Sequence, residues 1–295
     1  MNQPRILITG AGGLLGWRVV RLFIDECHLF LHYHHPLEGG APPDSIVGDL
    51  GEMPIVEELA GKFAPQVIIN CAALADVDRC EREPGLSYRA NVTAVKNLLV
   101  AFPDAKLVHI STDYIFNGAA PAKPEDKPAP MNIYGQHKLA AEKLVLAASP
   151  KNLVVRTNST YDHLGRYSFF HYVYGNLTSG KEVYGVTDQT SNPIGAFNAA
   201  ALILRLLKKE AAGVFHIGGK DFVSRCEFSR MIAEFFGLRS VLIVPVTSRE
   251  LVRPARRPKI AGLDCAATES FLGSFMPSLA DQFGWIREEL RQNQA

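Results

Sequence analysis

The fold of this chain is decided near its start by Arg5-Ile6-Leu7-Ile8-Thr9-Gly10-Ala11-Gly12-Gly13-Leu14-Leu15-Gly16. The first five of these residues are β-prone, and residues 17–27 carry apolar side chains at helical spacing. The stretch therefore predicts a strand, a glycine turn and a helix. Its glycines allow a tight turn and close approach of the backbone to a pyrophosphate, whose charge would lie over the helix N-terminus. We interpret the turn as a dinucleotide-binding site.

The rest of the chain continues the alternation of strand and helix. Strands separated by helices predict a parallel sheet that is covered on both faces. We expect an α/β fold, with a Rossmann-like doubly wound parallel sheet over residues 1–157. Residues 158–295 are expected to form mainly a smaller substrate-binding lobe, interleaved with the end of the sheet. The expected strands are 29–33, a short run ending at Asp49, 67–69, 107–110, 153–156 and 214–217, and the expected helices are 55–63, 91–101, 134–147, 197–209 and 227–236.

The composition is that of a globular protein with balanced charge. The chain has 295 residues, 47% of them hydrophobic, and Lys plus Arg (31) exceed Asp plus Glu (30) by one. This balance supplies no electrostatic footprint for nucleic acid and no polybasic membrane patch. The five cysteines are widely spaced without a Cys-x-x-Cys motif, which indicates free thiols. No stretch resembles a signal peptide or reaches the roughly 20 apolar residues of a membrane helix. We expect a soluble, cytoplasmic protein.

Tyr134 and Lys138 form a candidate proton-delivery pair. Four residues apart on a helix, they would share one face. A nearby ammonium favours the phenolate, so we expect Lys138 to lower the pKa of Tyr134 toward the working range of a general acid. The pair alone is a weak motif. Its context is stronger, because Ser111-Thr112-Asp113 lies upstream and a proline-rich loop at 121–130 leads into the helix.

The end of the second strand bears on the choice of cofactor. It reads Tyr33-His34-His35-Pro36, without the acidic residue that would bind the 2′-hydroxyl of NAD. We therefore expect NADPH, with NADH as the alternative, and place His34 near the 2′-phosphate; solvated histidines are the competing interpretation. Asp49 and Leu50 are expected to meet the adenine. The predicted cofactor-binding residues are Gly10, Gly13, Leu14, Leu15, Gly16, His34, Asp49, Leu50, Ala72, Ala73, Leu74, Ala75, Tyr134 and Lys138.

Taken together, the motifs resemble the extended short-chain dehydrogenase/reductase family, and within it the dTDP-4-dehydrorhamnose reductase group. The resemblance covers nearly the whole chain. It lies in the glycine turn, Asn70-Cys71-Ala72-Ala73, Ser111-Thr112-Asp113, Tyr134-Gly135-Gln136-His137-Lys138 and Pro254-Ala255-Arg256-Arg257-Pro258. It implies an NADPH-dependent reductase of a nucleotide-activated 4-keto-6-deoxy sugar, a small-molecule substrate.

The resemblance also implies the roles of individual residues. Tyr134 would donate a proton to the keto oxygen as hydride arrives from the nicotinamide, Lys138 would hold the nicotinamide ribose, and Thr112 would bind the same oxygen. For Thr112 the competing interpretation is a hydroxyl that caps local backbone. The predicted substrate residues are Thr112, Asp113, Ser159 and Arg256.

Several positions depart from the family pattern. Ser159 stands where an aromatic residue is usual. Ile194 replaces a threonine, which implies the loss of a polar contact near the substrate pocket. Arg18 replaces a glutamate that helps bind a dimer-bridging metal in some members, so we predict no metal site. Arg256 belongs to a basic cluster for a diphosphate or, alternatively, to a solvated surface. The cluster consists of Arg249, Arg253, Arg256, Arg257 and Lys259.

Two other functions remain open from the sequence. An epimerase or dehydratase of the same family would share the catalytic residues and regenerate its cofactor. A non-catalytic NADP-binding regulatory subunit, similar to the beta subunit of methionine adenosyltransferase, would keep the fold without turnover. A homodimer is the candidate assembly. His109, within an apolar strand, is interpreted as a core residue with its hydrogen bonds satisfied.

Overall fold

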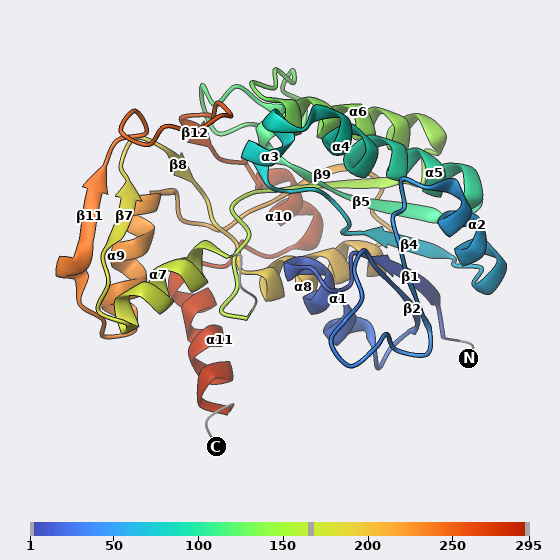
Figure 1. The fold of residues 1–295 in the computed structure, drawn as a ribbon, viewed down its shortest axis with the longest axis horizontal. Coiled ribbons are helices and arrows are strands. Elements are labelled where there is room, and N and C mark those ends of the chain that lie inside the picture. Colours follow the sequence, from blue (N-terminus) through green and yellow to red (C-terminus); the bar gives the residue numbers. More distant parts are fainter. Residues whose placement is uncertain (1–2, 165–167, 293–295) are drawn as a thin grey trace.

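A seven-stranded parallel sheet forms the centre of the computed structural model, which describes residues 3–164 and 168–292 (Figure 1). The strand order is β3-β2-β1-β4-β5-β6-β9, and every neighbouring pair is parallel. This order reverses beside β1, as in doubly wound sheets, and confirms the predicted fold class. The strands are β1 (Arg5–Thr9), β2 (His28–Tyr33), β3 (Ser45–Val47), β4 (Val67–Asn70), β5 (Lys106–Thr112), β6 (Leu153–Thr157) and β9 (Gly213–Ile217).

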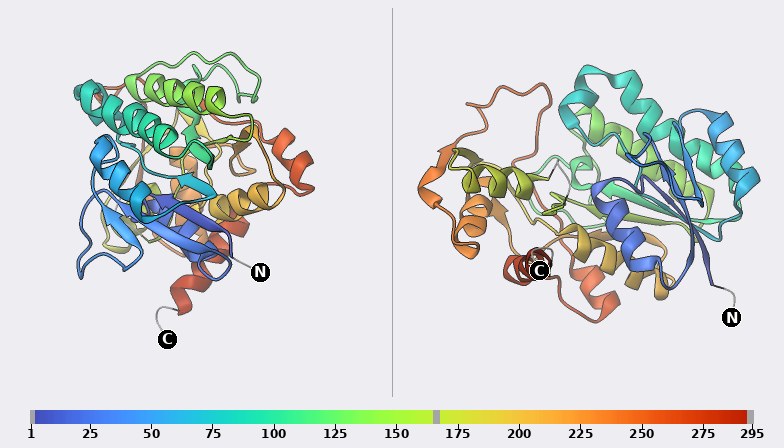
Figure 2. Two further views of the ribbon diagram at one scale, coloured as in Figure 1. Left: turned by 90° about the vertical axis from the view of Figure 1, so that its right-hand side faces the viewer. Right: turned by 60° about the horizontal axis from the view of Figure 1, so that its bottom comes forward.

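Helices cover both faces of this sheet, because its strands carry apolar side chains on both faces and each face must be shielded from water. Each face has its own hydrophobic core. One face carries α1 (Leu14–Phe23), α8 (Ala196–Lys208) and α10 (Ala266–Leu272) (Figure 2). The other carries α2 (Met53–Lys62), α3 (Val77–Arg82), α4 (Pro84–Tyr88), the π-helical turn η1 (Arg89–Thr93), α5 (Ala94–Ala101) and α6 (Ile133–Ala148).

The second half of the chain completes this layer structure. Strand β9 pairs with β6 at the edge of the sheet, and α8 packs beside α1. The sheet is therefore not finished until residue 217. The division into residues 1–157 and 158–295 stays a prediction, together with the interleaving expected for it.

A smaller lobe lies at one end of the sheet, to the left in Figure 1. It contains two small sheets, one pairing β7 (Val183–Val186) with β11 (Ile243–Val246), the other ordered β10-β8-β12. Aromatic side chains fill its core, where the ring of Tyr161 packs against those of Phe170, Phe228 and Phe283. The remaining elements are β8 (Thr190–Ser191), β10 (Val223–Ser224), β12 (Ile260–Ala261), α7 (Phe169–Thr178), α9 (Arg225–Phe235), α11 (Leu279–Gln292) and the 3-10 turns η2 (Asp113–Ile115) and η3 (Ser240–Leu242). None of the helices within the described ranges has the length and apolarity needed to span a bilayer.

Candidate active site

The glycine turn lies at the carboxyl end of β1, where the strand order reverses and open α/β sheets place their ligands. Gly10 has a φ of 66°, and a Cβ on Gly16 would lie 2.1 Å from the carbonyl oxygen of Gly10. A side chain at Gly16 would thus force helix and turn apart. Gly13 precedes α1 without a capping side chain, and the first turn of α1 has no acidic residue. Its N–H groups, unpaired within a helix, can bind a pyrophosphate.

A buried histidine holds this turn in place. The Gly10 N–H donates to Nδ1 of His32 at 3.3 Å, and Nε2 of His32 lies 2.9 Å from the Gly48 carbonyl oxygen. Because a carbonyl can only accept, Nε2 must carry the proton and Nδ1 must accept. Burial lowers the pKa of His32 to about 4, so the ring stays neutral near pH 7. His32 could not be predicted from the sequence, since a histidine within a strand carries no signal of its partner.

The other predicted adenosine contacts lie at the same edge of the sheet. His34 is exposed beyond the end of β2, and its ring centroid lies 4.4 Å from that of His35. Asp49 forms an ion pair of 2.8 Å with Arg89. Leu50 is buried, and its carbonyl accepts a hydrogen bond from Asn97.

The segment after β4 follows the glycine turn closely. A Cβ on Gly10 would lie only 2.7 Å from the nitrogen of Ala72. Ala73 and Ala75 are exposed, while Leu74 is fixed by Asn91, whose amide bonds both the N–H and the carbonyl of Leu74 at 3.1 Å. Small side chains thus leave room beside the turn, and Asn91 from η1 is a second supporting residue that the sequence analysis missed.

The three predicted catalytic residues come together where β5 meets α6. Thr112 ends β5, Tyr134 lies in the first turn of α6, and Lys138 follows one turn later with its Nζ bonded to the Ile110 carbonyl at 2.6 Å. The start of α6 is held by Asn132, which accepts from the Gly135 N–H at 2.8 Å. A Cβ on Gly135 would lie 2.1 Å from the carbonyl oxygen of Tyr114, so glycine alone permits this approach.

Electrostatics at Tyr134 differ from the sequence-based expectation. Burial raises its pKa, the Asp113 carboxylate raises it further, and only the Thr112 hydroxyl acts in the opposite direction. The expected lowering of the Tyr134 pKa below its ordinary value therefore does not occur, and the Lys138 amine is turned toward β5, where it bonds Ile110 and His109. The phenol is therefore firmly protonated near pH 7.

Asp113 is a buried acid near Tyr134 whose pKa is strongly shifted. It is buried, its Oδ1 accepts from Thr112 at 2.9 Å, and its Oδ2 has no hydrogen-bond partner among the described residues. Burial raises its pKa to about 7, although Thr112 and the charge of Arg225 oppose the shift. Arg225 begins α9 and stacks over Phe169, with its guanidinium carbon 4.6 Å from the ring centroid. The sequence analysis missed Arg225 because it lies far along the chain in the smaller lobe.

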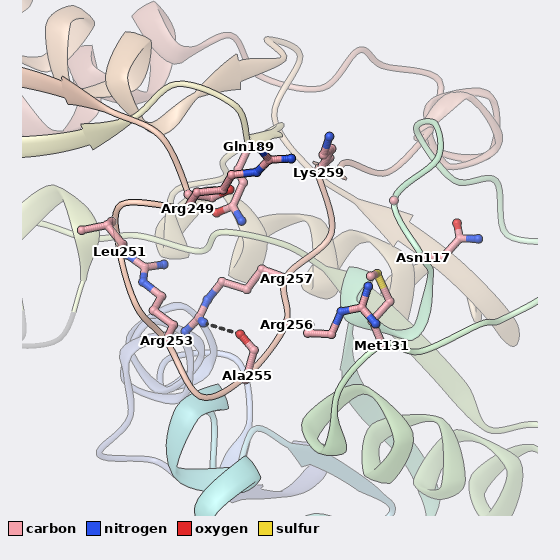
Figure 3. Close-up of a pocket in the computed structure, with 12 residues that line it drawn as sticks. Asn117, Met131, Gln189, Arg249, Leu251, Arg253, Ala255, Arg256, Arg257 and Lys259 are labelled. Atoms are coloured by element: carbon pink, nitrogen blue, oxygen red, sulfur yellow. Dashed lines mark hydrogen bonds between the residues drawn. The ribbon is translucent and has the colours of Figure 1, made fainter.

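A basic cavity of about 580 Å³ adjoins the start of α6 (Figure 3). It does not include Tyr134, but the Asn132 amide donates to the Arg256 carbonyl at 2.8 Å and so joins the cavity wall to the cap of α6. Arg257 is fixed by Asp78 through bonds of 3.0 and 2.7 Å. Among the residues that the structure describes, its four basic neighbours form no ion pair. These are Arg249, Arg253, Arg256 and Lys259.

Comparison with known proteins places this site in a family. The model described as the RmlD substrate binding domain matches residues 4–284. The chain belongs to the RmlD substrate-binding domain family.

Its relatives are similar to this chain along most of their length. The probable low-salt glycan biosynthesis reductase Agl14 of Haloferax volcanii is 34% identical, over 93% of this chain and 94% of its own. The dTDP-4-dehydrorhamnose reductase of Mycobacterium tuberculosis is 33% identical over 89% and 85%. The solved dTDP-4-dehydrorhamnose reductase of Bacillus anthracis in complex with NADP has a TM-score of 0.87 at 29% identity, covering 97% and 99%. The family expected from the sequence is thus confirmed.

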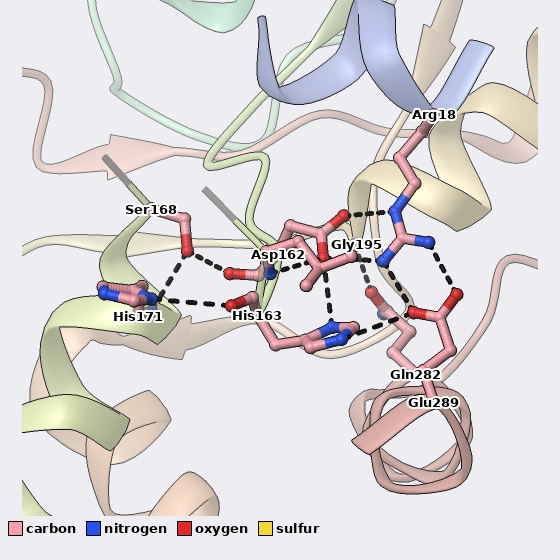
Figure 4. Close-up of polar contacts among 9 residues, drawn as sticks. Arg18, Asp162, His163, Ser168, His171, Gly195, Gln282 and Glu289 are labelled. Atoms are coloured by element: carbon pink, nitrogen blue, oxygen red, sulfur yellow. Dashed lines mark hydrogen bonds and ion pairs between the residues drawn. The ribbon is translucent and has the colours of Figure 1, made fainter. Parts of the chain in front are cut away.

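At Arg18, one of the departures from the family pattern, the structure has a buried ion cluster (Figure 4). The guanidinium bonds Asp162 at 2.5 and 2.8 Å and Glu289 of α11 at 2.6 Å. Burial alone would raise the pKa of Asp162, but the bonds from Arg18 outweigh it and lower the pKa to about 2. Across residues 3–164 and 168–292 no group of three His, Cys, Asp or Glu side chains is arranged for a metal ion. The absence of a metal in the working protein stays a prediction.

Two further departures from the RmlD family pattern have different surroundings. Ser159 adopts a left-handed φ of 37°, and its hydroxyl lies 2.9 Å from that of Ser191. Ile194 was expected near the substrate pocket, but its side chain is fully buried in the core under the sheet. A polar side chain at 194 would lack water there, so this replacement affects packing instead of a polar contact with a ligand.

Proposed function

We propose that this protein is an NADPH-dependent reductase of a nucleotide-activated 4-keto-6-deoxy sugar, similar in activity to dTDP-4-dehydrorhamnose reductase. The observation that carries the proposal is the meeting of Thr112, Tyr134 and Lys138 at the sheet edge that also bears the glycine turn. The names of the relatives in Mycobacterium tuberculosis and Bacillus anthracis support the same activity.

The residues around the turn fit a dinucleotide. Gly10, Gly13 and Gly16 leave a cradle that a Cβ would fill, and the free end of α1 offers N–H groups to the pyrophosphate. Lys138 would bind the nicotinamide ribose. When bound, NADPH supplies the hydride. His34, without a neighbouring acid at the end of β2, supports NADPH over NADH, as does the NADP complex of the Bacillus anthracis relative.

Tyr134 would act as the proton donor. Its raised pKa keeps the proton on the phenol until negative charge develops at the keto oxygen of the substrate. The Thr112 hydroxyl would bind the same oxygen and stabilise that charge. Asp113, with one buried oxygen unpaired among the described residues, would accept a hydrogen bond from a sugar hydroxyl.

The basic cavity would hold the diphosphate of the substrate. Arg249, Arg253, Arg256 and Lys259 supply positive charge, and none of them forms an ion pair with an acidic side chain of the described residues. Arginine forks match phosphate oxygens in geometry and charge. The bond from Asn132 to the Arg256 carbonyl would keep this phosphate site at a constant distance from Tyr134. Ser159 would border the sugar from the smaller lobe.

Cofactor consumption tests the proposal. We expect stoichiometric oxidation of NADPH, and slower oxidation of NADH, when the protein is mixed with a panel of nucleotide-linked 4-keto-6-deoxy sugars. Product formation without net loss of NADPH would instead identify an epimerase or dehydratase. Tight NADPH binding with no oxidation by any sugar of the panel would favour the regulatory subunit. A homodimer stays a prediction that light scattering can test.

A further inference from the structure

Four buried polar side chains form a continuous chain from the glycine turn to Lys138. Thr9 of β1, Asn70 of β4 and His109 of β5 are paired across neighbouring strands, Thr9 with Asn70 and Asn70 with His109. Residues paired in this way point to the same face of the sheet. The hydrogen-bond distances are 2.6 Å from Thr9 Oγ1 to Asn70 Oδ1, 3.1 Å from Asn70 Nδ2 to His109 Nδ1, and 3.0 Å from His109 Nε2 to Lys138 Nζ.

In one arrangement, the donors and acceptors of this hydrogen-bond chain fit an uncharged Lys138. Thr9 donates to the Asn70 oxygen, and the Asn70 amide donates to Nδ1 of His109. Nε2 of His109 then carries the ring proton and donates to an uncharged Lys138 amine, which itself donates to the Ile110 carbonyl. Every polar atom of the chain is paired in this direction.

The same chain also fits a charged Lys138. An ammonium can only donate, so Nε2 of His109 must become an acceptor and Nδ1 must carry the proton. The Asn70 amide then turns over, presenting its oxygen to His109 and its nitrogen to Thr9. The two ends of an amide have nearly the same shape, so this reversal requires no rearrangement of the strands.

We propose that His109 is a positioning residue that holds the Lys138 amine in both of its charge states, donating to the neutral amine and accepting from the ammonium. Imidazole suits this role because its two nitrogens exchange donor and acceptor functions. The row of hydrogen bonds joins Lys138 to Thr9, the residue directly before the glycine turn. The two parts of the proposed cofactor site are thereby connected through the interior of the sheet.

The surrounding charges allow both states near neutral pH. Burial lowers the pKa of Lys138 to about 8, and the charge of the Glu142 carboxylate opposes the shift. Glu142, one turn further along α6, is itself paired with Arg156 at 2.8 Å. Burial raises the pKa of Cys71, on the side of β4, to about 12, so this thiol is neutral. Burial and the charge of Lys138 hold the pKa of His109 well below its usual range, so its ring does not become a cation.

Nitrogen NMR of the histidine rings tests the proposal in the cofactor-free protein, so it does not depend on the proposed reductase activity. We expect the His109 proton to lie on Nε2 at about pH 9.5 and on Nδ1 at about pH 6.5, with the change centred near the pKa of Lys138. The His109→Gln variant identifies the signal by its loss. His32 is an internal control, since Gly10 and Gly48 fix its tautomer at both pH values.

Three variants separate positioning from packing. Lys138→Met should abolish the tautomer change of His109. In NADPH titrations, His109→Phe should weaken binding by about tenfold, since the Lys138 ammonium loses an acceptor. The pH at which NADPH binding is lost as Lys138 deprotonates should also fall by about one unit. His109→Gln, which can also donate or accept, should restore both. A His109 tautomer that is the same at both pH values, or equal defects in the Phe and Gln variants with unchanged pH dependence, would overturn the proposal.

Discussion

Tyr134 keeps its phenolic proton in this protein because burial and the neighbouring Asp113 both disfavour the phenolate. A proton donor benefits from this environment, whereas a general base would be weakened by it. The phenol is therefore ready to donate its proton in the proposed reduction of the keto group.

Replacing Tyr134 by Phe removes that proton but keeps the ring. We expect kcat for the keto sugar to fall by about 10²- to 10⁴-fold, the usual contribution of a positioned acid, with little change in the dissociation constant for NADPH. Steady-state kinetics and a fluorescence titration measure the two quantities. The matched control is Tyr88→Phe, at an exposed position on α4. Full activity in Tyr134→Phe would remove this residue from the mechanism.

Asp113 should make the protein less stable as the pH rises. Its pKa is about 7 in the folded protein and about 3.9 in an unfolded chain. A raised acid pKa means that the folded state binds the extra proton, so stability is lost as the pH rises from about 4 to about 7. In urea unfolding, Asp113→Asn should therefore gain about 2–4 kcal/mol more, relative to the wild type, at pH 8 than at pH 4. An equal difference at both pH values would contradict this account.

At the scale of elements, the glycine turn depends on the approach of α1 to β1. Gly16→Ala would bring a methyl group to within 2.1 Å of the Gly10 carbonyl and displace the helix terminus that faces the cofactor. We expect NADPH affinity to fall roughly tenfold or more, measured by calorimetry. Gly61→Ala in α2, where an added Cβ meets nothing within 4 Å, should leave the affinity unchanged. Unaltered binding in Gly16→Ala would place the pyrophosphate elsewhere.

The elements of the parallel sheet could be predicted from the sequence because each is a local pattern. The apolar run of β1, the glycines after it and the helical spacing of α6 need no distant partner to be recognised. Strands β7 and β11 were not predicted, since each has only four residues and the two strands, which pair with each other, lie far apart in the sequence. Helices α7 and α11 were also not assigned, because their apolar faces are completed only by the aromatic core of the smaller lobe. Helix α10 was not assigned either, since it is short and packs against the distant main sheet.

The residues of the candidate site also divide into those that a local pattern predicts and those that depend on a distant partner. Thr112, Tyr134 and Lys138 were predicted from their own spacing and motif context. His32, Asn91 and Arg225 were not, because each acts through a contact with a residue distant in sequence. His109 was expected to be a satisfied core residue, and it is buried and hydrogen-bonded; its bond to Lys138 was beyond what the sequence could predict.

At the scale of the molecule, Arg18 joins the two halves of the chain. Its side chain extends from α1 and bonds Asp162 and Glu289, which belong to the second half of the chain. Arg18→Met should lower the free energy of unfolding by about 3–5 kcal/mol, because Asp162 would remain buried without its cation. Lys208→Met, which breaks the exposed pair with Glu26, should cost about 1 kcal/mol or less. Chemical unfolding compares them, and equal costs would show that Arg18 does not join the halves.

Strand β9 has a consequence for how the protein is made. β6 is synthesised about sixty residues before the end of β9. During that time the growing chain carries an open sheet edge and an α1 that α8 does not yet cover. We expect a fragment ending at residue 157 to aggregate or to be cleaved rapidly by protease, whereas the whole chain resists; a protected, monomeric fragment would refute this. Nascent chains of this protein are thus candidates for chaperone binding until their last sheet strand has left the ribosome.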